Sequence, residues 1–82
     1  MDITNKPPFK IPQKEFYDLA DLLRYCRRYR GMTQKEVAAE LGFSYQQYQK
    51  YEYGIYTPKK VNREKIAKAL KIDVRMLQAL AS

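Results

Sequence analysis

The stretch that decides the fold is residues 34–53, which read QKEVAAELGFSYQQYQKYEY. Thr33 and Glu36, at its start, have the spacing of a capping box, in which each side chain bonds the other residue's backbone N–H. Gly42 is placed to end the helix that follows, because glycine adopts a left-handed backbone without steric cost. This pattern predicts a helix of about eight residues that stops at Gly42.

A second short helix is predicted directly after that turn, over residues 45–53. Ser44 offers an N-cap for it, and Gly54 is placed to close it. Ala38 supplies the small side chain needed where the two helices cross. Apolar side chains that would seat both helices on a core are Val37, Leu41, Phe43, Tyr48 and Tyr51. This spacing is typical of a helix-turn-helix unit.

The flanking segments predict three more helices and no strand. A helix over residues 14–29 is indicated by the apolar stripe Phe16, Leu19, Leu22, Leu23 and Cys26, with Gly31 beyond its end. Asn62 is expected to cap a fourth helix with Ile66, Ala67 and Leu70 inward, and Asp73 a fifth with Leu77 and Leu80 inward. Residues 1–13 contain three prolines and no helical period, so we expect an extended arm there. The chain is therefore predicted to be an all-α bundle of five helices over residues 14–82, behind an N-terminal arm.

The composition narrows the classes of function that are open to this chain. Sixteen Lys and Arg against nine Asp and Glu give the 82-residue chain a formal charge of +7, which favours nucleic acid or another anionic surface as partner. With no His and one cysteine, Cys26, neither a zinc site of the usual ligands nor a His-based catalytic pair can form. We therefore expect no catalytic residues, metal or cofactor, and a protein that is not an enzyme. The lack of a secretory signal or long apolar run predicts a cytoplasmic protein without a membrane partner.

The chain resembles the phage-repressor and Cro (XRE) helix-turn-helix domain over about residues 19–80. The residues that carry the resemblance are Leu23, Arg27, the run from Gly31 to Ala38, the run from Leu41 to Ser44, the run from Glu52 to Gly54, Pro58 and the run from Ile66 to Leu70. The resemblance implies a compact, lambda-repressor-like bundle whose third helix enters the major groove of DNA.

The resemblance also implies site residues. The positions for reading bases are Tyr45, Gln46, Gln49 and Lys50. The positions for contacting phosphates are Thr33, Gln34, Tyr53, Lys59 and Lys60. Arg27 and Glu52 are expected to form a partly buried ion pair that ties the first helix to the third. The implied function is transcriptional regulation, with repression expected, by a homodimer in a bacterial or phage-infected cell.

The eight tyrosines depart from the family pattern. Tyr48 and Tyr51 stand where the family generally has Ile, Val or Leu, so either the third helix is shifted or their hydroxyls reach phosphates. The exposed aromatics Tyr25, Tyr29, Tyr53 and Tyr56 either form a protein interface, where tyrosine is enriched, or are scattered surface residues. A homodimer would use these tyrosines or the last helix, through Val74, Met76, Leu77 and Leu80. Two alternatives stay open: an antitoxin that also binds a toxin, and a protein-interaction module that reuses the fold.

Overall fold

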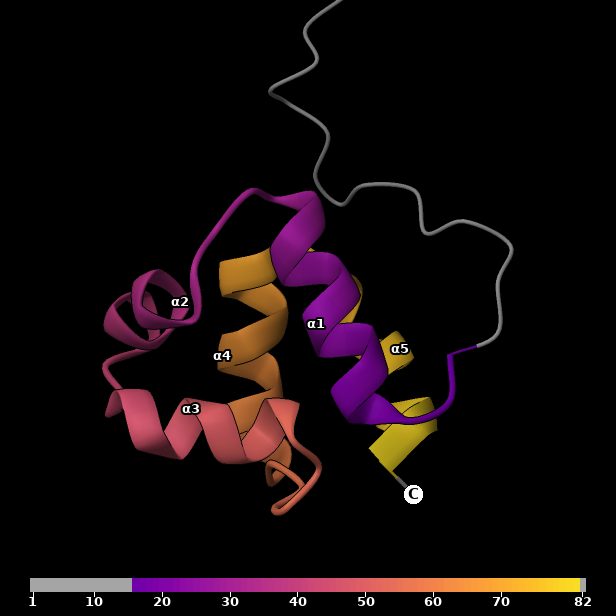
Figure 1. The fold of residues 1–82 in the computed structure, drawn as a ribbon. Coiled ribbons are helices and arrows are strands. Elements are labelled where there is room, and N and C mark those ends of the chain that lie inside the picture. The colour runs from indigo at the N-terminus through magenta and orange to yellow at the C-terminus, as the bar shows by residue number, and fades with distance from the viewer. Residues whose placement is uncertain (1–15, 82) are drawn as a thin grey trace, which may run out of the picture.

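Residues 16–81 fold as an all-α bundle of five helices, as predicted (Figure 1). The computed structural model describes residues 16–81, within which there is no strand. The helices are α1 (Leu19–Tyr29), α2 (Gln34–Leu41), α3 (Tyr45–Glu52), α4 (Lys60–Leu70) and α5 (Val74–Ala81). The arm predicted over residues 1–13 lies outside the described residues.

Helix α1 begins at Leu19, whereas the sequence predicted a start at about residue 14. Of the predicted helical residues that the structure describes, Phe16, Tyr17 and Asp18 are not helical. Asp18 has an extended backbone, and its carboxylate accepts the backbone N–H of Asp21 at 2.9 Å. An aspartate in this role satisfies one of the unpaired donors of the first turn and starts the helix. The apolar stripe correctly predicted the buried face of the helix, but the N-cap residue Asp18 determines where the helix begins.

The segment from α2 to α3 has the local structure that its sequence predicts. Thr33 and Glu36 form both hydrogen bonds of the capping box, at 3.0 and 2.9 Å. Gly42 has φ +75° and ends α2, and the Ser44 hydroxyl accepts the N–H of Gln47 at 3.0 Å to open α3. Helix α3 ends at Glu52, one residue before the predicted end.

The predicted cap of α4 is wrong. The helix begins at Lys60, and Asn62 lies inside its first turn, where its amide donates to the Tyr51 hydroxyl at 3.1 Å. Lys59 occupies the N-cap position without a side-chain hydrogen bond. The start instead follows Pro58, which is buried and whose carbonyl accepts from the Arg63 guanidinium at 2.9 Å. For α5 the predicted cap is present, since the Asp73 carboxylate accepts the N–H of Arg75 at 2.9 Å.

One hydrophobic core joins all five helices. Helix α3 packs on α1 and α2, while α4 packs on α2 and α5. The fully buried apolar side chains include Leu22, Leu23, Cys26, Val37, Tyr48, Ile66, Leu70 and Leu77. Burial raises the pKa of the Cys26 thiol to about 12. Of the helices in residues 16–81, none is long and apolar enough to cross a membrane.

Candidate nucleic-acid interface

Helix α3 has a buried side and a solvent-facing side. Tyr48, Tyr51 and Glu52 are buried against the rest of the domain, whereas Gln46 and Lys50 are exposed. Figure 1 shows α3 crossing one end of the molecule, with no other helix over its outer side. Its position therefore depends on the contacts of its inner side.

The strongest of those contacts is an ion pair between Arg27 of α1 and Glu52 of α3. The Arg27 Nε donates to Glu52 Oε2 at 2.5 Å, and the second nitrogen of the fork donates to Oε1 at 3.1 Å. A further Arg27 nitrogen donates to the Met32 carbonyl at 2.8 Å. The hydrogen bond to Glu52, more than any other interaction, raises the pKa of Arg27. Because Glu52 is wholly buried, its charge depends on these partners.

Glu52 also receives a hydrogen bond from the predicted phosphate contact Gln34. The Gln34 amide nitrogen donates to Glu52 Oε1 at 3.0 Å, and its amide oxygen accepts from Gln49 at 3.4 Å. Gln49 donates to the Tyr53 hydroxyl as well, at 3.3 Å. A chain of hydrogen bonds thus runs from the buried Glu52 to Gln49, one of the predicted base-reading residues. The structure brings together five of the site residues that the family resemblance implies: Arg27, Gln34, Gln49, Glu52 and Tyr53.

Arg24 is a member of this cluster that the sequence analysis did not single out. Its guanidinium donates to the backbone carbonyl of Glu52 and lies 3.8 Å from the Asp21 carboxylate. The bonded carbonyl is at the end of α3, where helix carbonyls lack intrahelical partners and where a cation is favourable. Its position three residues before Arg27, on the same helical face, was the available signal.

The two unusual tyrosines of α3 point into the domain. The Tyr51 hydroxyl accepts from Asn62 at 3.1 Å and from Gln47 at 3.4 Å. The Tyr48 hydroxyl has no hydrogen bond of good geometry among the described residues. The pKa of Tyr48 is raised mainly by burial and, to a smaller extent, by the neighbouring Glu52. Both rings belong to the core. The phenols are accommodated inside the domain, so the prediction that their hydroxyls reach phosphates is wrong.

On the outer side, two cations lie over tyrosine rings. The Lys50 ammonium is 5.2 Å from the centre of the Tyr56 ring, and the Lys35 ammonium is 5.3 Å from that of Tyr45. Such contacts restrict a long side chain while its charge stays in solvent. Tyr45 is half-buried and Gln46 is exposed. The sequence analysis did not anticipate either ring contact, because no spacing rule relates these pairs.

The remaining predicted phosphate contacts are all exposed. Thr33 precedes α2, Tyr53 follows α3, and Lys59 and Lys60 mark the start of α4. Within residues 16–81 these two lysines have no ion-pair partner. Of the other predicted surface aromatics, Tyr25 is half-buried and packs against Phe16 and Tyr29, at ring distances of 5.5 and 6.4 Å.

Comparison with known proteins gives one positive finding. A family model described as helix-turn-helix matches residues 23–80, which is most of the chain and spans the end of α1 through nearly all of α5. A comparison with curated proteins gave no match.

Proposed function

The chain belongs to the XRE-type helix-turn-helix family and is a DNA-binding transcription regulator; from this premise we propose that it is a repressor that reads the major groove with α3. The observation that carries the proposal is the division of α3 into an inner side held by buried contacts and an outer side of polar groups. A reading helix needs both features, because its side chains must reach base edges from a fixed position.

The proposed base contacts follow from the chemistry of the exposed groups. An amide such as that of Gln46 can donate to N7 and accept from N6 of adenine, and an ammonium such as that of Lys50 can donate to guanine. The phenol of Tyr45 offers contact with a thymine methyl. Gln49 completes the set, with its amide already oriented by Gln34 and Tyr53.

The proposed phosphate contacts flank this face. Thr33 uses its oxygen in the capping box, but its hydroxyl hydrogen is available to donate to a phosphate. Lys59 and Lys60 supply charge beside it, and Tyr53 supplies a phenol. The Gln34 side chain is engaged by Glu52 and Gln49, so we assign its phosphate contact to the backbone N–H at the start of α2.

We further propose that the protein binds as a homodimer, because one reading helix covers only a half-site and two must lie about 34 Å apart on the duplex. Leu77 is buried in the core and is removed from the interface predicted on the last helix. The exposed apolar side chains between α3 and α4 are the better candidates, with Ile55 60% and Tyr56 56% exposed. Such a repressor would act at a promoter in the nucleoid of a bacterium or of a phage-infected cell.

Selection of duplexes from a random DNA library at near-physiological salt tests this function. An inverted repeat with half-site centres about one helical turn apart is expected. If no motif emerges and binding disappears with modest added salt, only phosphate attraction is present and the proposal is wrong. In that case an antitoxin or protein-interaction role becomes the better account, with the exposed Tyr53 and Tyr56 as its contacts.

Two substitutions separate base contacts from phosphate contacts. Gln46→Ala is expected to cost roughly 1–3 kcal/mol at one operator position, whereas Lys59→Ala should weaken binding to every duplex alike. Competition binding with operators mutated at single positions measures the difference. Equal losses on all duplexes for Gln46→Ala would remove Gln46 from the base-reading set.

A further inference from the structure

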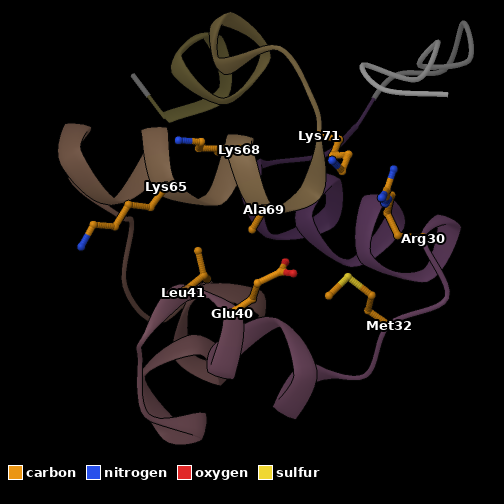
Figure 2. Close-up of a pocket in the computed structure, with 8 residues that line it drawn as sticks. All are labelled: Arg30, Met32, Glu40, Leu41, Lys65, Lys68, Ala69 and Lys71. Atoms are coloured by element: carbon orange, nitrogen blue, oxygen red, sulfur yellow. The ribbon is translucent and has the colours of Figure 1, made fainter. Parts of the chain in front are cut away.

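A pocket of about 440 Å³ lies between α2 and α4, away from the surface discussed above. Figure 2 shows eight lining residues, contributed by the connection between α1 and α2, by the end of α2, and by the second half of α4 with the residue after it. Figure 1 places the ends of α1 and α4 at one end of the bundle and α3 across the other. A duplex held against the outer side of α3 therefore leaves open the part of the pocket that lies at the ends of α1 and α4.

The lining carries an excess of positive charge. It holds the four cations Arg30, Lys65, Lys68 and Lys71, and the single carboxylate of Glu40. In residues 16–81, no ion pair joins any of these side chains to an acid or a base. The Lys65 ammonium has a ring contact, 5.9 Å over Phe43. Charges gathered at one place without internal partners are suited to an external anion.

The pocket also has an apolar floor. Leu41 is buried there, and Met32 and Ala69 are half-buried. Methionine is flexible and polarisable, and it adapts to the shape of an apolar group placed on it. Phosphate or nucleic acid would use the cations and leave this floor uncovered. The combination fits a ligand that brings an apolar side chain together with acids.

The backbone of Lys71 supports a role for its side chain. Three glycines adopt positive φ among the described residues, and Lys71 is the one non-glycine residue that does so, at φ +59°. It ends α4 in the manner in which Gly42 ends α2. The left-handed backbone has a higher conformational energy for lysine than for glycine, because lysine has a Cβ atom. Backbone strain of this kind is found where a side chain is needed for function, and Lys71 lines the pocket.

We propose that the pocket docks an acidic, amphipathic peptide segment of a partner protein. An apolar side chain of the peptide rests on Met32, Leu41 and Ala69, and its flanking carboxylates meet Lys68, Lys71 and Arg30. The segment contacts the pocket and DNA contacts the outer side of α3, so both bind at once. This inference stands on the pocket alone and does not depend on which bases α3 reads.

The experiment is selection from a random peptide display library by the full chain, with polyaspartate as competitor to remove peptides held by net charge alone. The enriched peptide is then synthesised with a fluorescent label and titrated by anisotropy. Lys68→Glu and Arg28→Glu form the matched pair: both reverse one exposed helical cation, but Arg28 lies outside the pocket lining. Glu40→Gln and Lys71→Gly complete the set.

We expect acidic peptides with an apolar residue to be enriched. Lys68→Glu should weaken binding of the peptide roughly tenfold or more, and Arg28→Glu should change the Kd by less than about twofold. Glu40→Gln should tighten binding, because it removes a carboxylate that repels the acidic peptide. Lys71→Gly should weaken binding of the peptide while raising the Tm of the protein, so that a loss of binding is distinguished from a loss of folding. The proposal is overturned if no peptide is enriched, if the enriched peptides lack acids, or if Lys68→Glu and Arg28→Glu weaken binding equally.

Discussion

Two charged regions of this small domain are built in opposite ways. At the junction of α1 and α3, the wholly buried Glu52 is surrounded by donors from Arg24, Arg27 and Gln34. In the pocket between α2 and α4, Glu40 and three of the four cations are exposed and Arg30 is half-buried, and none of the five has an ion pair among the described residues. The charges of the first region have ion-pair partners inside the fold, whereas those of the second have no ion-pair partner within residues 16–81.

The difference distinguishes charges that hold the structure from charges that are available to a ligand. A buried carboxylate is stable only when its partners are in place, so Glu52 links the position of α3 to α1 and α2. An exposed, unpaired charge adds little to stability and keeps its affinity for another molecule. Substitutions at matched positions should therefore affect stability in the first region and binding in the second.

The largest expected effect is that of Glu52→Ala, compared with Glu40→Ala. Loss of the Glu52 carboxylate leaves Arg27 partly buried and unpaired, and should cost about 3–5 kcal/mol. In a domain of this size that lowers the Tm by more than about 10 °C. Glu40→Ala should change the free energy of unfolding by less than about 0.5 kcal/mol. Thermal melts followed by circular dichroism measure both, and similar losses for the two variants would contradict the distinction.

An intermediate effect is expected from the two buried tyrosines. Tyr51→Phe removes a hydroxyl that accepts two hydrogen bonds and should cost about 1 kcal/mol. Tyr48→Phe removes a buried hydroxyl without a well-formed hydrogen bond and should leave stability unchanged or raise it by up to about 1 kcal/mol. Urea denaturation resolves differences of this size. A larger loss for Tyr48→Phe than for Tyr51→Phe would mean that the Tyr48 hydroxyl stabilises Glu52.

The smallest effect concerns the exposed pair of Asp73 and Arg75, in which two atoms approach to 2.6 Å. The hydrogen bonds from Arg75 lower the pKa of Asp73 from its ordinary 3.8 to about 2. A lowered carboxyl pKa contributes stability above pH 3.8 that is lost as the pH falls towards 2. Arg75→Ala should return the pKa of Asp73 towards 3.8, as NMR titration of its carboxyl would report. The Tm should change little at neutral pH, because both groups are exposed.

The two pH-dependent outcomes of that variant are distinguishable. If Arg75 acts only through Asp73, the difference in Tm between the variant and the parent shrinks as the pH falls through 2 and disappears below it, where Asp73 becomes protonated in both. A difference that persists at that pH would show that Arg75 stabilises α5 in another way.

Many residues of the candidate site could be predicted, because the family pattern assigns roles to particular positions. The side-chain contacts that those residues make could not be predicted in the same way. The resemblance pairs Arg27 with Glu52, and the structure has them in direct contact. The same resemblance assigns Gln34 to phosphate, although its side chain is bonded to Glu52 and Gln49. Both bonds join residues from different helices, at separations of 18 and 15 positions, so no local spacing reveals them.

The sequence by itself determined the features that depend on neighbours along the chain. The capping box of Thr33, the glycine end of α2 and the N-cap of Ser44 are made within three or four residues, so composition and spacing specify them. Only the tertiary structure decided that Asn62 bonds Tyr51 instead of capping α4, that Arg24 reaches the end of α3, and that cations gather unpaired between α2 and α4. Those outcomes depend on how helices distant in sequence pack against one another, and packing sets which polar groups are buried together and which stay in solvent.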